Sequence, residues 1–256
     1  MTSTRDLLDF AIDAAWQAGR VTLASFQTGV PVEWKADASP VTVADRAAEQ
    51  LLRQLIERRF PDHAVFGEEF GETDRDSTHR WIIDPIDGTQ SFIRGVPLYG
   101  VLVGLEIAGE MVVGVAGFPA LGEMVAAATS LGCTWNGRPA HVSSTDELAD
   151  AVVSLTSSSN LSRLQPSAWE RLQQKTRIQR GWGDCYGHCL VATGRTDIML
   201  DPVLSPWDCA ALLPILREAG GTFTDWTGTP TIDGGNGIST NGALFEQVMA
   251  IVRDAE

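Results

Sequence analysis

The chain has 256 residues, of which 44% are apolar, and this suffices for one large core or two fused lobes. Its formal net charge of −14 argues against binding DNA or RNA through a basic surface, because neutralising phosphates needs an excess of Lys and Arg. A small phosphorylated substrate is still compatible with this charge, since bound metal ions can supply positive charge.

The sequence contains neither a membrane-spanning pattern nor a secretion signal. No run of about 18 apolar residues without a charge occurs, as a transmembrane helix requires. The N-terminus carries Arg5, Asp6 and Asp9 on an amphipathic pattern, which differs from the layout of a signal peptide. We therefore expect a cytoplasmic protein that contacts no membrane.

The first half of the chain predicts two helices followed by an antiparallel sheet. Apolar residues at helical spacing predict a helix over 4–27. A second helix opens at 42–45, runs to about Arg59 and is stopped by Pro61. Short strands are expected at 64–67 and 81–84. Alternating residues and turn signals between Tyr99 and Ser143 predict a meander of about four or five strands.

The second half alternates between strands and helices, which is typical of a layered α/β lobe. The predicted elements are a strand at 151–155, a helix at 166–174, a strand at 177–180, a helix at 184–193, a strand at 197–200, a helix at 206–219, a strand at 222–224 and a last helix from about Ala243. Polar residues cluster near 140–150. We therefore predict an N-terminal α+β lobe over 1–145 and a C-terminal α/β lobe over 146–256.

Two carboxylates three residues apart follow the apolar run 81–83. Asp84 and Asp87 flank the carbonyl group of Ile86, and this supplies the close oxygen ligands that Mg²⁺ requires. Glu68 follows its own predicted strand, and Asp208 lies at the start of a predicted helix. Either helix-opening acid, Asp45 or Asp208, could instead be the third residue of a capping box. Taken together, the acids at strand and helix ends favour a metal site over separate caps.

Gly88 and Thr89 follow the acidic turn and are expected to open a short helix. Free backbone N–H groups at a helix start bind phosphate oxygens, and Gly88 allows close approach. The Thr89 hydroxyl could orient a metal-bound water, with Asp45 as the acceptor. The sequence thus predicts a phosphate cradle next to the metal site.

Four cysteines occur, at positions 133, 185, 189 and 209. Their spacing fits neither a disulfide framework nor a CxxC pair. Cys185, His188 and Cys189 could share one helix face as zinc ligands, but no fourth ligand is evident, so buried thiols are the favoured interpretation.

The motifs Gly67-Glu68-Glu69, Asp84-Pro85-Ile86-Asp87-Gly88-Thr89, and Trp207-Asp208 with Glu218-Ala219-Gly220-Gly221 together resemble the inositol monophosphatase family over nearly the whole chain. The segment from Lys35 to Asp45 resembles an early motif of that family.

The resemblance implies an α-β-α-β-α sandwich, a homodimer, and phosphomonoester hydrolysis with two or three Mg²⁺ ions per site. It implies metal ligation by Glu68, Asp84, the Ile86 carbonyl, Asp87 and Asp208. It further implies catalytic roles for Asp45, Thr89 and Glu68, and phosphate binding by Asp87, Gly88 and Thr89.

One branch of the family fits best. Gly183-Asp184-Cys185, with Asp201-Pro202, resembles the histidinol-phosphate phosphatases. Asp184, Cys185, Asp201 and Asp208 are the expected substrate-binding residues, and the extra acids Asp184 and Asp201 suit a cationic leaving group. Alternatively, Asp184 caps the helix that it opens and Asp201 ends a strand. An inositol-1-phosphate phosphatase, or a related sugar or nucleotide phosphatase on the same scaffold, is the alternative. A catalytically silent member is disfavoured because every expected metal ligand is present.

Overall fold

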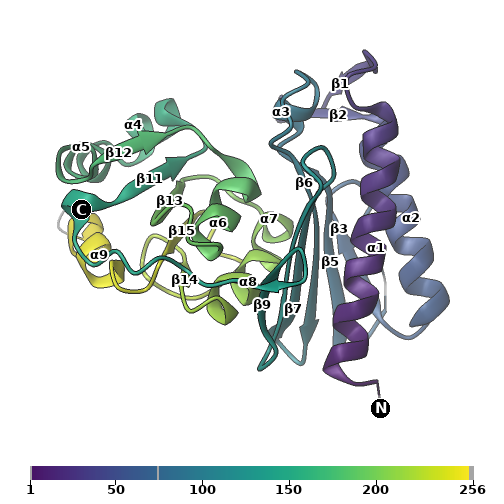
Figure 1. Ribbon diagram of the computed structural model, residues 1–256. Helices are drawn as coiled ribbons and strands as arrows, with labels where there is room; N and C mark the ends of the chain where they lie inside the picture. Colours follow the sequence, from purple (N-terminus) through teal and green to yellow (C-terminus); the bar gives the residue numbers. More distant parts are fainter. Residues whose placement is uncertain (1, 74, 254–256) are drawn as a thin grey trace.

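Two helices cover one face of an eight-stranded sheet (Figure 1). The computed structural model describes residues 2–73 and 75–253. Helices α1 (Thr4–Ser25) and α2 (Val43–Arg59) each begin with a capping box, and both bury alanine and leucine side chains against the sheet. The two predicted N-terminal helices are confirmed, although α1 ends two residues earlier than expected.

The first sheet carries the predicted meander. Its strands are β3 (Ala64–Gly67), β4 (Gly71–Glu72), β5 (His79–Asp87), β6 (Gly100–Ile107), β7 (Glu110–Phe118), β8 (Glu123–Ala128), β9 (Gly132–Trp135) and β10 (Arg138–Pro139). Their order is β10-β9-β8-β7-β6-β5-β3-β4. The sheet is not wholly antiparallel, because β4 pairs with the outer edge of β3 and β5 then runs parallel to β3 on its other side.

The second sheet is mixed and has helices on both faces. Its strands, in the order β12-β11-β13-β15-β14, are β11 (Val152–Leu155), β12 (Ile178–Arg180), β13 (Ile198–Asp201), β14 (Thr222–Thr224) and β15 (Gly237–Thr240). On its outer face lie α4 (Ser158–Leu164), α5 (Pro166–Lys175) and α9 (Phe245–Arg253). Between the two sheets lie α6 (Asp184–Ala192), α7 (Pro206–Ala210) and α8 (Leu212–Glu218). The layers alternate α-β-α-β-α, which confirms the expected sandwich.

The helix predicted over 206–219 is wrong as a single element, because α7 and α8 are separated at Ala211. Pro214 has no N–H group to bond the carbonyl of Ala210, and this missing bond favours a break one turn before the proline. The break packs directly on the sheet. A Cβ atom on Gly114 of β7 would lie 2.0 Å from the Ala211 oxygen, and one on Gly104 of β6 would lie 2.9 Å from Ala210. Only glycine permits this approach, which brings the start of α7 to the end of β5.

Several short elements escaped the sequence analysis. They are the hairpin β1 (Val32–Trp34) and β2 (Pro40–Thr42), β4, the short helix η1 (Leu148–Asp150), α4 and β15. The short helix expected after Gly88 is present as α3 (Thr89–Phe92). The two sheets match the expected lobes in content, while the division at residues 145 and 146 stays a prediction.

Candidate active site

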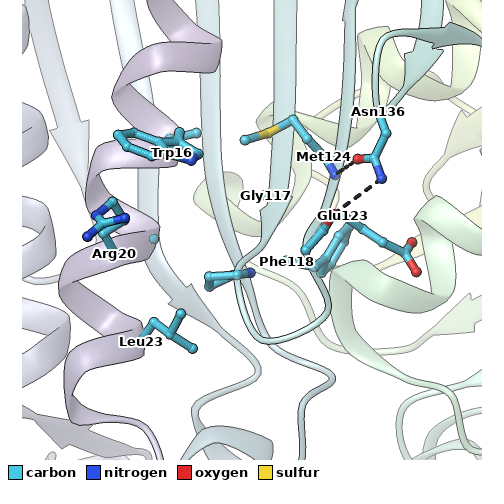
Figure 2. A pocket seen from close by; sticks show the side chains of 12 residues that line it. Trp16, Arg20, Leu23, Gly117, Phe118, Glu123, Met124 and Asn136 are labelled. Carbon is cyan, nitrogen blue, oxygen red and sulfur yellow. Dashed lines mark hydrogen bonds between the residues drawn. The ribbon is translucent and has the colours of Figure 1, made fainter.

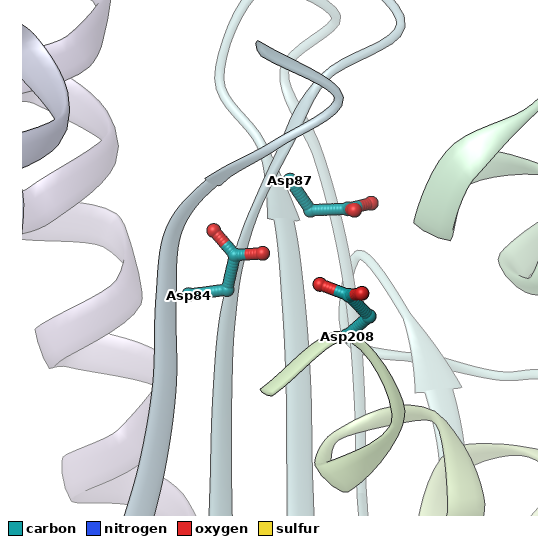
Figure 3. A group of neighbouring side chains, drawn as sticks. All are labelled: Asp84, Asp87 and Asp208. Carbon is teal, nitrogen blue, oxygen red and sulfur yellow. The ribbon is translucent and has the colours of Figure 1, made fainter. Parts of the chain in front are cut away.

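A β-bulge in β5 turns two acids toward the same cavity. Along β5, Asp84 pairs with Leu102 of β6 and Asp87 pairs with Gly100, so three steps on β5 oppose two on β6. In a regular strand, residues three apart point to opposite faces, and one extra residue corrects this. Pro85 tolerates the interrupted ladder because it has no N–H to lose. The side chains of Asp84 and Asp87 therefore lie on the same side (Figure 3).

Asp208 joins these two carboxylates from the start of α7. The Ser205 N–H donates to Asp208 Oδ2 at 2.7 Å, which completes a capping box and orients the acid. Ligand atoms of Asp84, Asp87 and Asp208 all lie within 4.8 Å of one another. The cap and the clustered acid are therefore the same residue, and the two interpretations of Asp208 are compatible.

The charge balance of this cluster suits bound cations. Burial raises the pKa of Asp84 well above its ordinary value, and the charges of Glu68 and Asp87 raise it further. Burial and the nearby Asp208 raise the pKa of Asp87 to about 7. Burial likewise raises the pKa of Asp208 to about 7. Three close carboxylates, two of them buried and one half-buried, repel one another unless protons or metal ions neutralise them. An all-oxygen donor set of this kind fits a hard divalent cation.

Glu68 lines the same cavity but is bound to a lysine. Lys35 Nζ donates to Glu68 Oε1 at 2.8 Å and to Glu69 Oε1 at 2.7 Å. The cavity has a volume of about 310 Å³, and its lining includes Lys35, Glu68, the three clustered aspartates, Ile86, Gly88 and Thr89. The structure thus brings the five predicted metal ligands to one cavity, with Glu68 outside the tight group of three.

Asp45 and Thr89 are predicted to act on a water molecule, and each has a free acceptor. Asp45 Oδ2 accepts from the N–H and the hydroxyl of Thr42, whereas its buried Oδ1 has no hydrogen-bond partner among the described residues. The Thr89 hydroxyl donates to the Ile86 carbonyl at 3.0 Å, so its oxygen can only accept further bonds. Their catalytic roles stay a prediction.

The start of α6 adjoins the acidic cluster. The Cys185 N–H donates to Asp87 Oδ2 at 2.5 Å. Asp184 adopts a positive φ of 54°, and a Cβ atom on Gly88 would lie 3.0 Å from Asp184 Oδ2. Asp184 thus reaches the expected phosphate cradle rather than capping α6, whose N-cap is Gly183.

Asp201 is 4% exposed and is linked to Asp184 through one side chain. Burial raises the pKa of Asp201 to about 7, with a further contribution from the charge of Asp184. Thr156, which the sequence analysis missed, links the two acids: its hydroxyl donates to Asp201 Oδ2 and accepts from the Asp184 N–H at 2.9 Å. Its position directly after the predicted strand 151–155 could have identified it as a candidate site residue.

The cysteines behave as buried thiols. All four are free and buried. The His188 side chain bonds Ser239 Oγ through Nδ1 at 2.7 Å. Within residues 2–73 and 75–253, the only group of three or more potential metal-binding side chains is the aspartate cluster. The zinc alternative therefore gains no support.

A second cavity, of about 350 Å³, lies between α1 and the β7–β8 hairpin (Figure 2). Trp16 and Leu23 of α1 face Phe118 and Met124 across it. The carboxylate in its lining, Glu123, pairs with Arg195 at 2.9 Å. This mostly apolar groove offers no cluster of groups for phosphate chemistry, so the candidate active site is the acidic cavity.

Known proteins share both the fold and the sequence over nearly the full length. The model of the inositol monophosphatase family matches residues 3–256. The chain belongs to this family. It is 46% identical to a histidinol-phosphatase from Chlorobaculum parvum, covering 97% of both chains. It is 39% identical to a histidinol-phosphatase from Mycobacterium tuberculosis, covering 96% of this chain and 97% of the relative.

A solved structure agrees with these relatives. The inositol monophosphatase from Anabaena (Nostoc) sp. PCC 7120 superimposes with a TM-score of 0.85 at 32% identity, covering 98% of this chain and 97% of that one. Membership of this family makes the protein a phosphoric monoester hydrolase, with small phosphorylated compounds as substrates. No helix in the described part of the chain has the length and apolar character needed to span a membrane.

Proposed function

We propose that the protein is a Mg²⁺-dependent histidinol-phosphatase that hydrolyses L-histidinol phosphate to L-histidinol and phosphate, a step of histidine biosynthesis. The observation that carries this proposal is the set of acids that extends from the Asp84–Asp87–Asp208 cluster to Asp184 and Asp201, all with pKa values raised chiefly by burial. Full-length similarity to histidinol-phosphatases supports the same substrate.

Magnesium is the cation that best suits the donor set. Asp84, Asp87, Asp208, the Ile86 carbonyl and Glu68 would hold two or three ions, with Glu68 leaving Lys35 to do so. Bound Mg²⁺ would supply positive charge to the phosphate oxygens and lower the pKa of a water molecule.

The remaining catalytic work falls to side chains and amides of this chain. The backbone N–H groups of Gly88 and Thr89 would bind phosphate oxygens, since the first amides of a helix have no partner within it. A water that donates to Asp45 Oδ1 and Thr89 Oγ1 would keep a lone pair free for in-line attack on phosphorus. The positive φ of Gly88, 82°, supports this cradle.

Selectivity would come from the acids on the leaving-group side. Histidinol phosphate carries an ammonium and an imidazole, whereas inositol carries only hydroxyls. Burial is the main cause of the raised pKa values of Asp87 and Asp208. Asp201 lies near enough to both for its charge to raise these pKa values further. A cationic leaving group would neutralise this excess negative charge, and a neutral one would not.

A panel of phosphate esters tests the proposed substrate. Phosphate release should depend on Mg²⁺. The kcat/KM for L-histidinol phosphate should exceed that for inositol 1-phosphate, fructose 1,6-bisphosphate and a nucleotide 3′-phosphate by at least about tenfold, because each of these esters lacks one charged contact to the protein. A higher kcat/KM for inositol 1-phosphate would favour the alternative within the family. If none of the esters is hydrolysed in a Mg²⁺-dependent manner, the proposal is wrong.

Asp201→Asn should raise KM for histidinol phosphate about tenfold, because one charged contact to the ammonium is lost. KM for p-nitrophenyl phosphate, whose leaving group has no cation, should change less than about twofold by the same reasoning. Thr156→Val keeps the charge of Asp201 but removes the hydroxyl that holds it, so an intermediate effect is expected. Equal changes for both substrates would contradict a contact between Asp201 and the ammonium.

The homodimer and the cytoplasmic location stay predictions.

A further inference from the structure

Helix α2 presents a stripe of charged residues to the turn that carries Glu68. Asp45, Glu49 and Arg53 are spaced four residues apart, so they lie on one face of the helix. Asp45 lies near enough to Glu68 for the charge of Glu68 to contribute, after burial, to the raised pKa of Asp45. Glu49 and Arg53 continue the same stripe toward the β3–β4 turn, and neither was singled out from the sequence.

Glu49 is completely buried, and its carboxylate binds that turn. Glu49 Oε2 accepts from the Glu69 N–H at 2.7 Å, and Oε1 accepts from the Phe70 N–H at 3.1 Å. Both amides follow immediately after Glu68. The carboxylate therefore fixes the backbone on the C-terminal side of a predicted metal ligand.

The residue before Glu68 is shaped for the same contact. A Cβ atom on Gly67 would lie 2.2 Å from Glu49 Oε1, so any larger residue would displace the carboxylate. Arg53 Nε donates to Glu49 Oε1 at 2.8 Å, and its Nη2 donates to the Gly71 carbonyl. Hydrogen bonds thus hold the turn at Glu69, Phe70 and Gly71, and Gly67 packs against the Glu49 carboxylate. The side chain of Glu68 lines the cavity.

A buried carboxylate is costly unless charges and hydrogen bonds compensate it. Here one arginine and two amides compensate it, and all of them serve the placement of one short turn. Packing alone does not need a charge at this position, because an apolar side chain could fill the space at lower cost. The hydrogen bonds to the turn distinguish Glu49 from a side chain that only fills space in the core.

We propose that Glu49 is a positioning residue that fixes the Glu68 turn and thereby sets the affinity of the active site for divalent cations. This rests on the proposed function only in that Glu68 binds metal. Residues that orient metal ligands typically change metal affinity by 10- to 100-fold when they are replaced. Glu49 is not among the residues that line the acidic cavity, and its hydrogen bonds within the described part of the chain go to Arg53 and to the Glu69 and Phe70 amides, so its effect should be confined to the metal.

Glu49→Gln tests the proposal, since the amide has nearly the same shape but only one acceptor oxygen. We expect the dissociation constant for Mg²⁺ or Mn²⁺, measured by calorimetry on the whole protein without substrate, to rise at least about tenfold. In activity assays the metal concentration for half-maximal rate should rise by the same factor, while kcat at saturating metal and KM for the substrate stay within about twofold. Glu49→Asp keeps the charge on a shorter side chain, so its dissociation constant for the metal should lie between those of the wild type and Glu49→Gln.

Glu57→Gln on the same helix is the matched control. Glu57 is exposed and pairs with Arg75 at 3.8 Å, away from the turn. It should leave metal affinity unchanged. If Glu49→Gln lowers the melting temperature of the metal-free protein but binds metal as the wild type does, Glu49 is only structural and the proposal is overturned. If the wild type itself binds no divalent cation, the proposed function fails first, and the two failures are thereby distinguished.

Discussion

Asp87→Asn is expected to lower kcat about 10³-fold or more in saturating Mg²⁺, because it removes one charged ligand worth several kcal/mol to the transition state. Asp87 lies at the centre of the site: it belongs to the tight group of three carboxylates and accepts a hydrogen bond from the Cys185 N–H. The asparagine oxygen can still accept that bond, so the contact between β5 and α6 should persist. Circular dichroism should show an unchanged fold, and phosphate release should be nearly lost.

Asp197→Asn provides the control for this experiment. Asp197 is also buried and also accepts a backbone N–H, that of Val152 at 2.7 Å, but it is not among the residues lining the acidic cavity. It should lower the melting temperature without removing turnover. Activity of Asp87→Asn within about tenfold of the wild type would mean that Asp87 is not an essential metal ligand.

The sequence predicted the acids of the site better than their surroundings. Asp84, Asp87 and Asp208 could be found because each lies at the end of a strand or the start of a helix, where signals in the sequence are strongest. The bulge that turns Asp84 and Asp87 to one side depends on pairing with β6, which local sequence does not specify. The sequence therefore indicated which residues meet, but not how the backbone lets them meet.

Contacts between distant elements account for most of what was missed. Thr156 and Glu49 act through hydrogen bonds to residues far along the chain, at Asp201 and at the turn after Glu68. Short elements such as β1, β2 and β15 have too few residues for a periodic pattern to emerge. The break between α7 and α8 was visible in principle, since Pro214 lies within the predicted helix.

Removing the metal should make the stability of the protein depend on pH in an unusual direction. Burial, as the largest cause, raises the pKa values of Asp87, Asp184, Asp201 and Asp208 to about 7. In the unfolded chain these groups titrate near the ordinary value of 3.8. Between these values the folded state binds more protons than the unfolded one. The stabilising contribution is therefore complete below about pH 4 and is lost as the pH rises through about 7.

One buried histidine acts in the opposite direction and must be separated from this effect. Burial lowers the pKa of His188 to about 3, so the unfolded state binds the extra proton below about pH 6.5 and His188 costs stability as the pH falls. Because His188 bonds Ser239 and is not among the clustered acids, its contribution should be the same with and without metal. The comparison of metal-free and metal-bound protein at each pH therefore isolates the carboxylates.

We expect 10 mM Mg²⁺ to stabilise the protein by about 3 kcal/mol more at pH 7.5 than at pH 5, or roughly 6–12 °C in Tm. At pH 5 protons already neutralise part of the cluster and compete with the metal, whereas at pH 7.5 the ionised acids repel one another until cations bind. Thermal unfolding in EDTA and in Mg²⁺ at both pH values measures the difference. Asp208→Asn should shrink it, because the variant has one fewer carboxyl group to titrate. A Mg²⁺ effect of equal size at both pH values would mean that the clustered acids are not the groups that bind the metal.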